Sequence, residues 1–253
     1  MPNGMAKGMP INPDNTRNDA TNTMSASSTD KGLLTPDNCG VIFIDYQPRM
    51  WFGAANADRQ SILSNVLLLA KTAKIFAVPV ILTAVESEWM DGNIAPQLLE
   101  LFPDATPIKH SGMNSWDSKE VVAAVKQTRR KNFLVAALWS DAHLTFPSLQ
   151  MLEEGYGVYA VVNASGGTSH DAHTLAIRRI EQAGAVSVTA LQVLLEFQRD
   201  WARKEHYEEV MAVIKEHCVS CGREIEHVYS MIEGIPALSD QQIATSKNQR
   251  VVR

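Results

Sequence analysis

Short runs of consecutive apolar residues alternate along the chain with stretches of helical periodicity. The apolar runs predict strands buried on both faces, over residues 39–45, 78–85, 132–138, 156–162 and 185–189. Between the first two runs, apolar residues recur at helical spacing, as at Ile62, Val66 and Leu69. Strands that alternate with helices are typical of a parallel sheet whose crossover connections are helical.

We therefore expect an α/β fold, a three-layer αβα sandwich around a mostly parallel, doubly wound, Rossmann-like sheet. Local signals place the helix ends. Asp117 and Glu120 are typical of a capping box that opens a helix. Gly155 has the character of a helix C-cap, and Thr168 or Ser169 would begin a further helix as its N-cap.

Composition divides the chain into three parts. Residues 1–37 are rich in Asn, Thr, Ser, Asp, Gly and Pro without apolar periodicity, which predicts a disordered arm, or else a tail that docks on a neighbouring subunit. Residues 38–205 contain the strand and helix alternation, and form the expected domain. Residues 206–253 are expected to be a helical extension and tail, since the pattern beyond Leu191 is helical without strand signals.

Charge and hydropathy exclude several kinds of partner. The net charge is −5 and the longest basic run is Arg129-Arg130-Lys131, so no nucleic-acid partner is expected. No segment approaches the ~20 apolar residues that cross a bilayer, and the N-terminus lacks the apolar core of a secretory signal. With 3 cysteines a disulfide scaffold is not expected. A cytoplasmic protein with a small-molecule substrate or ligand and no membrane partner fits these features.

Polar residues follow the predicted strands. In open parallel sheets ligands bind at the carboxyl ends of strands, and the residues there are Asp45, Gln47, Glu86 and the segments 139–143 and 163–168. An aspartate that closes a buried strand can orient or deprotonate a neighbour, although capping a turn is an equally simple interpretation. The segment 109–116 also carries titratable groups.

The glycine pattern does not predict a nucleotide cofactor. No G-x-G-x-x-G follows the first strand and no G-x-x-x-x-G-K-[ST] occurs, so we expect no cofactor. Cys218 and Cys221 form a C-x-x-C with His227 nearby, but the companion pair of a structural zinc site is missing. His170 and His173 could line a pocket rim, and exposure in the first turn of a helix is the simpler interpretation.

Several short motifs in fixed order resemble those of a known family. They are Val41-Ile-Phe-Ile-Asp45-Tyr-Gln47, Ile81-Leu-Thr83, Asn114-Ser-Trp116-Asp, Ala137-Leu-Trp139-Ser-Asp-Ala-His143-Leu-Thr-Phe146-Pro147 and Asn163-Ala-Ser-Gly-Gly-Thr168. Over about residues 38–205 the chain is similar to the isochorismatase-like cysteine hydrolases, in particular to the YcaC-type subgroup. The resemblance implies a homo-oligomeric hydrolase of a small-molecule C–N amide or related bond.

The resemblance also implies a triad of aspartate, a basic residue and a cysteine nucleophile. The aspartate corresponds to Asp45. The basic residue corresponds to Lys109 or His110, and ungapped alignment from Phe102 favours His110. The cysteine position, with no gap on either side, is His143.

Further site residues follow from the same resemblance. Gln47 matches the family's glutamine two positions after the aspartate, and the backbone N–H groups of Trp139 and His143 correspond to the oxyanion hole. Trp116, Trp139 and Phe146 could form an aromatic wall for a substrate. Core packing explains Phe146 equally well.

The histidine changes the expected chemistry. An imidazolium at a helix N-terminus is opposed by the helix dipole by ~0.3–1 kcal/mol, so we expect His143 to be neutral. One hypothesis is a hydrolase in which His143 is general base or nucleophile, Asp45 orients it and Lys109 or His110 neutralises charge. A second is a non-catalytic relative that binds a ligand or serves assembly. A third is a metal site on Asp45, His110 and His143, although we expect no metal.

Overall fold

The computed structural model describes residues 32–86 and 93–218, and every structural statement below concerns these residues. Their six strands form one sheet in the order β3-β2-β1-β4-β5-β6, and every neighbouring pair is parallel. The strands are β1 (Cys39–Ile44), β2 (Val80–Val85), β3 (Ile108–His110), β4 (Asn132–Ala137), β5 (Gly157–Val161) and β6 (Val186–Val188).

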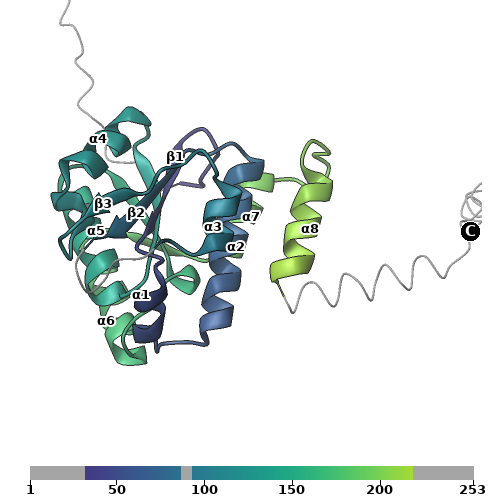
Figure 1. Ribbon diagram of the computed structural model, residues 1–253. Helices are drawn as coiled ribbons and strands as arrows, with labels where there is room; N and C mark the ends of the chain where they lie inside the picture. The colour runs from purple at the N-terminus through teal and green to yellow at the C-terminus, as the bar shows by residue number, and fades with distance from the viewer. Residues whose placement is uncertain (1–31, 87–92, 219–253) are drawn as a thin grey trace, which may run out of the picture.

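Helices cover both faces of this sheet, which confirms the expected αβα sandwich (Figure 1). One face packs against α2 (Arg59–Ile75), α3 (Pro96–Leu101), α7 (Ala190–Gln198) and α8 (Tyr207–His217). The other face packs against α4 (Lys119–Gln127), α5 (Thr145–Glu153) and α6 (His170–Gln182). The shorter elements are α1 (Pro48–Gly53), η1 (Ser115–Asp117), η2 (Ser140–Leu144) and η3 (Val162–Ala164).

Strand β1 shows why the apolar runs are continuous. Its side chains alternate between two cores: Val41 and Phe43 lie in the first, and Ile42 and Ile44 in the second. A strand has a side-chain period of two, so a strand covered on both sides must be apolar at every position.

The structure corrects the N-terminal boundary of one helix and adds a strand. Ser118, and not Asp117, caps α4, because its hydroxyl accepts from the N–H of Val121 (3.4 Å), whereas Asp117 belongs to η1. Strand β3 was not predicted. Its three residues lie at the sheet edge, and only its first residue is apolar. The predicted cap at Gly155 is confirmed by its φ of +83°.

The expected helix beyond Leu191 is interrupted. Arg199, directly after α7, has a φ of +62°. Before α8 starts, the side-chain amide of Gln198 donates to the carbonyls of Asp200 and Arg203, both at 3.0 Å. The chain therefore turns, and α8 packs on α2 as a separate helix.

Packed structure begins before the first strand. Leu34 is fully buried, its N–H donates to Glu196 Oε2 (2.7 Å) and its carbonyl accepts from Arg199 (3.0 Å). The rest of the expected N-terminal arm lies outside the described residues, as do Cys221 and His227. Among the described helices, none has the length and apolar character needed to span a membrane.

The strand order creates a topological switch point between β1 and β4, which we call the crevice. The chain moves from β1 outward to β2 and β3, then returns to the other side of β1 to form β4. Neighbouring crossovers therefore leave β1 and β4 in opposite directions, and the gap at their carboxyl ends is where doubly wound sheets bind ligands. Asp45 directly follows β1, and η2 begins three residues after the end of β4.

Candidate active site

Asp45 is the central side chain of the crevice. It is fully buried and has a φ of +59°, in the left-handed region that aspartate tolerates better than most residues. Its N–H donates to the carbonyl of Thr83 (3.3 Å), and the Thr83 hydroxyl donates to Asp45 Oδ1 (2.9 Å). These bonds orient the carboxylate across the ends of the strands.

His110, the last residue of β3, contacts the same carboxylate oxygen. Its Nε2 is 2.9 Å from Asp45 Oδ1, and its Nδ1 is 3.0 Å from the carbonyl oxygen of Gly112. A carboxylate and a carbonyl only accept, so both ring nitrogens must carry protons and the ring is an imidazolium. Burial lowers the pKa of His110, but the hydrogen bond and charge of Asp45, with the Gly112 carbonyl, raise it above 6.5.

His143 contacts the other carboxylate oxygen. Its Nδ1 is 2.8 Å from Asp45 Oδ2, at an angle too oblique for a regular hydrogen bond. The side chain is fully buried, and its Nε2 has no hydrogen-bond partner in the described part of the chain. Because Nδ1 faces a carboxylate, the proton of a neutral ring belongs on Nδ1, which leaves a lone pair on Nε2.

The two imidazoles keep the aspartate ionised. Burial raises the pKa of Asp45, but the hydrogen bond from His110, the 2.8 Å contact with His143 Nδ1 and the charge of His110 outweigh it and hold the pKa at about 2. The carboxylate therefore links a cationic ring on β3 to a second ring on η2.

The turn η2 that carries His143 has an unusual backbone. It is a π-helical turn, a conformation that is rare and frequent at functional sites, and Trp139 before it has a φ of +57°. The Trp139 ring donates from Nε1 to the carbonyl of Met50 (3.0 Å). A Cβ at Gly53 would lie 2.4 Å from that nitrogen, so the packing requires glycine there.

The expected oxyanion-hole donor at His143 is already engaged. Its N–H donates to the carbonyl of Trp139 (2.9 Å), and so does the N–H of Ala142 (3.0 Å). A substrate oxygen would have to replace this bond.

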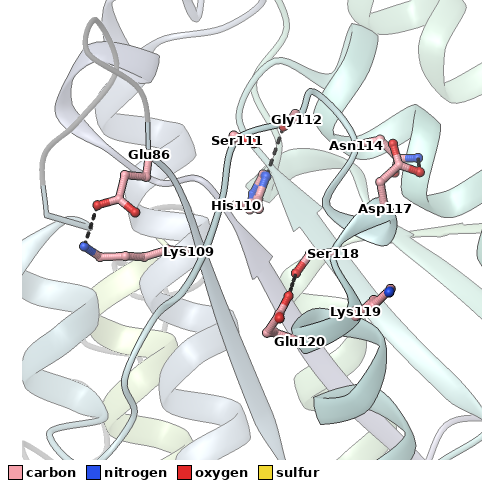
Figure 2. A pocket seen from close by; sticks show the side chains of 10 residues that line it. All are labelled: Glu86, Lys109, His110, Ser111, Gly112, Asn114, Asp117, Ser118, Lys119 and Glu120. Carbon is pink, nitrogen blue, oxygen red and sulfur yellow. Dashed lines mark hydrogen bonds and ion pairs between the residues drawn. The ribbon is translucent and has the colours of Figure 1, made fainter.

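The other predicted polar residues have separate positions. The side-chain amide of Gln47 is buried and pairs with the backbone of Val85 in both directions, at 3.0 and 2.8 Å. Lys109 is exposed and forms an ion pair with Glu86 (2.7 Å) (Figure 2). His110, and not Lys109, is therefore beside Asp45, while Gln47 fixes the end of β2.

The three predicted aromatic residues have different surroundings. Trp116 is buried in the core against Tyr156 (ring centroids 5.5 Å apart), and its Nε1 donates to Glu154 (2.7 Å). Phe146 is 36% exposed. Trp139 lies beside the site, with its ring 6.0 Å from that of His143.

A polar hollow of about 550 Å³ lies on the outer side of His110 (Figure 2). Charged side chains of both signs line it, including Glu86, Lys109, Asp117 and Glu120. His110 therefore lines this hollow and also contacts the buried carboxylate of Asp45.

The donor atoms do not surround a vacant position for a metal. Each oxygen of Asp45 directly contacts one imidazole nitrogen, at 2.9 and 2.8 Å. Among residues 32–86 and 93–218, no group of three or more His, Cys, Asp or Glu side chains is arranged to hold a metal ion.

The structure gives Thr83 and His173 surroundings that the sequence analysis did not predict. Thr83 bonds Asp45, and a polar residue in an otherwise apolar run was the available signal. His173 is buried rather than exposed, so the expectation of solvent exposure is wrong for it, whereas the side chain of His170 is 81% exposed.

Comparison with known proteins identifies a matching family and a relative in E. coli. The Isochorismatase domain family matches residues 39–192. The probable hydrolase YcaC of Escherichia coli K12 is 33% identical over 169 residues, which cover 66% of this chain and 81% of that protein.

Two solved structures share the fold over nearly their whole length. YcaC from Pseudomonas aeruginosa, with hexane-2,5-diol and covalent acrylamide, has a TM-score of 0.74 at 32% identity and covers 80% of this chain and 99% of its own. The E. coli YcaC structure, described as an octameric hydrolase of unknown specificity, has a TM-score of 0.74 at 30% identity and covers 79% and 97%.

Proposed function

Because this chain belongs to the isochorismatase family, we propose that it hydrolyses a C–N amide or related bond of a small molecule. In this proposal His143 occupies the position of the family's cysteine nucleophile. The unbroken motif from Ala137 to Pro147 supports that correspondence.

His143 is the general base of the proposed reaction. Its Nε2 accepts a proton from water while the water oxygen attacks the carbonyl carbon, and the same proton then passes to the leaving nitrogen as the C–N bond breaks. Asp45 fixes the ring with the proton on Nδ1 and stabilises the imidazolium that forms. His110 keeps Asp45 charged, since its own positive charge offsets the buried carboxylate.

The contact of 2.8 Å between His143 Nδ1 and Asp45 Oδ2 carries this proposal. In serine hydrolases the base also places one ring nitrogen beside a buried carboxylate, and its other nitrogen takes the proton of an adjacent hydroxyl. Here a water molecule takes the place of that hydroxyl.

A second candidate function is ligand binding or assembly without catalysis. Two observations favour it: Asp45 and His143 are both fully buried, and the N–H of His143 is bonded within its own turn. Catalysis requires that substrate and water reach Nε2, whereas a non-catalytic protein has no such requirement.

A hydrolysis screen separates the two functions. The wild-type chain is assayed against small amides, carbamoylated amines and esters, beside His143→Gln, which cannot accept the proton. His170→Gln, at an exposed histidine, is the matched control. Turnover in the wild type and the control, absent in His143→Gln, supports hydrolysis. Absence of turnover in all three supports the second function.

Restoring a thiol tests the correspondence of position 143 to the family's nucleophile. The relative from P. aeruginosa carries covalent acrylamide, and acrylamide adds to thiolates. We expect His143→Cys to be alkylated by acrylamide much faster than Cys39, which is buried with a pKa raised to about 12. Mass spectrometry of peptides identifies the modified residue, and equal or slower labelling at position 143 would contradict the correspondence.

We also propose that the chain is a homo-oligomer. The E. coli relative is described as octameric, and large apolar side chains are exposed at Phe52 (75%), Leu175 (60%) and Trp201 (50%). Size-exclusion chromatography with light scattering should give a multiple of the chain mass, and a monomer at micromolar concentration would exclude a stable assembly.

A further inference from the structure

His173 is a buried histidine that the proposed hydrolysis does not use. It lies in the first turn of α6, and its Nδ1 is 2.8 Å from the hydroxyl oxygen of Ser140, the first residue of η2. Both side chains are buried. This is therefore an internal polar contact between α6 and the turn that carries His143.

Ser140 is held by three groups at once. Its N–H donates to the carbonyl of Gly166 (2.8 Å), its carbonyl accepts from the hydroxyl of Thr145 (2.7 Å), and its hydroxyl contacts His173. A Cβ at Gly167 would lie 2.7 Å from both Ser140 Oγ and His173 Cβ. Only glycine at 167 lets α6 approach this closely, so the start of η2 is fixed to both neighbouring segments.

The surroundings of His173 favour the neutral form of its ring. Burial lowers the pKa of His173, the charge of Asp141 raises it and His170 lowers it, with a net lowering below 6.5. Asp141 itself accepts from the N–H (3.2 Å) and hydroxyl (2.9 Å) of Thr168. A neutral His173 can accept a hydrogen bond from the Ser140 hydroxyl, and a neutral ring needs no buried counter-charge.

We propose that His173 is a positioning residue, which acts through Ser140 to set where η2 presents residue 143 relative to Asp45. Ser140 is the first and His143 the fourth of the five residues of this π-helical turn. The hydrogen bond to His173 holds the first residue of the turn, and so the position of the turn as a whole. The inference rests on the proposed function only for its effect on hydrolysis.

The thiol of His143→Cys provides a test that does not require hydrolysis. In this background we compare His173→Phe, which keeps a ring but loses the bond to Ser140, with His173→Asn, whose side-chain amide can retain it. The measured quantity is the rate of acrylamide alkylation as a function of pH. We expect His173→Phe to lower the rate at neutral pH about tenfold or more and to raise the midpoint of the profile, because a displaced turn stabilises the thiolate less.

Two further results are expected if the hydrogen bond between His173 and Ser140 causes the change in alkylation rate. His173→Asn should retain most of the rate, and Ser140→Ala should reproduce the effect of His173→Phe without adding to it in the double variant. An unchanged profile in His173→Phe, with a native circular dichroism spectrum, would overturn the inference. Equal loss in His173→Asn and His173→Phe would also overturn it.

The outcomes separate this inference from the proposed hydrolysis. A shifted thiol profile in a protein that hydrolyses nothing supports the positioning role while the hydrolase proposal fails. Hydrolysis by the wild type, with kcat and its pH profile unchanged in His173→Phe, supports the hydrolase proposal while the positioning role fails.

Discussion

Asp45 lies between two histidines that have different partners. His110 faces an acceptor with each nitrogen, whereas His143 faces Asp45 with one nitrogen and has no partner for the other in the described residues. The first ring is therefore suited to hold a charge and the second to move a proton. This difference comes from neighbours brought together by the sheet, which the sequence around each histidine does not contain.

The charge of Asp45 should be essential to any hydrolysis. Asp45→Asn keeps the shape of the side chain but removes the charge that stabilises a protonated His143, so we expect kcat to fall about 10²–10⁴-fold. Steady-state kinetics on a substrate from the screen measures this. Asp37→Asn, at a carboxylate outside the crevice, is the control, and a fall of less than about threefold in Asp45→Asn would contradict the role.

The pKa shifts predict how stability depends on pH. The pKa of Asp45 is lowered from 3.8 to about 2. Its contribution to the free energy of unfolding is therefore present above pH 3.8 and is lost as the pH falls toward 2. The pKa of His110 is raised above 6.5, so its contribution is present below pH 6.5 and is lost as the pH rises through the native pKa. Urea unfolding should show a maximum between pH 3.8 and 6.5.

The variant His110→Lys tests whether the titration of His110 causes the loss of stability at higher pH. His110→Lys carries a charge that persists far above neutral pH, so the decline in unfolding free energy above pH 6.5 should be smaller than in the wild type. An equal decline in both proteins would show that another group causes it.

At the scale of elements, the crevice is built by the ends of strands and by side chains that fix them. The continuous apolar runs of β1, β4 and β5 could be predicted because burial on both faces demands them. Strand β3 could not, since it has three residues at the sheet edge and only one is apolar. That strand carries His110, and so the choice between Lys109 and His110 needed the structure.

Gln47 should stabilise the crevice rather than bind substrate. Its buried amide makes two hydrogen bonds with the backbone of Val85, and Gln47→Leu would leave both backbone groups unpaired. We expect a loss of about 2–4 kcal/mol in the free energy of unfolding, measured with urea. Gln60→Leu, at an exposed position of α2, is the control. A change below about 0.5 kcal/mol for Gln47→Leu would contradict this role.

At the scale of the whole molecule, the strand order decides which residues meet. Asp45, His110 and His143 are far apart in the sequence, and they meet because β1 lies between β2 and β4 and because β3 follows β2 at the edge. Sequence alone predicted that strand ends gather at one edge, and the resemblance supplied Asp45 and position 143. Neither could show that Trp116 packs in the core or that the His143 amide is already bonded.

The segment before β1 should contribute to the stability of the whole domain. Leu34 is fully buried beside α7, so Leu34→Ala should lower the free energy of unfolding by about 2–5 kcal/mol. Leu33→Ala, at a neighbour that is 63% exposed, should change it by about 0.5 kcal/mol or less. Urea unfolding compares the two variants, and equal effects would show that the segment does not pack as described.

The rate of amide hydrolysis by the wild type relative to His143→Gln tests the role of the Asp45–His143 pair most directly. Both proteins are purified identically and assayed with the best substrate from the screen. A general base at Nε2 predicts that the substitution lowers kcat/KM about 10²–10⁴-fold, while His170→Gln retains the wild-type value. Equal kcat/KM in the wild type and His143→Gln would contradict the role of His143 in hydrolysis.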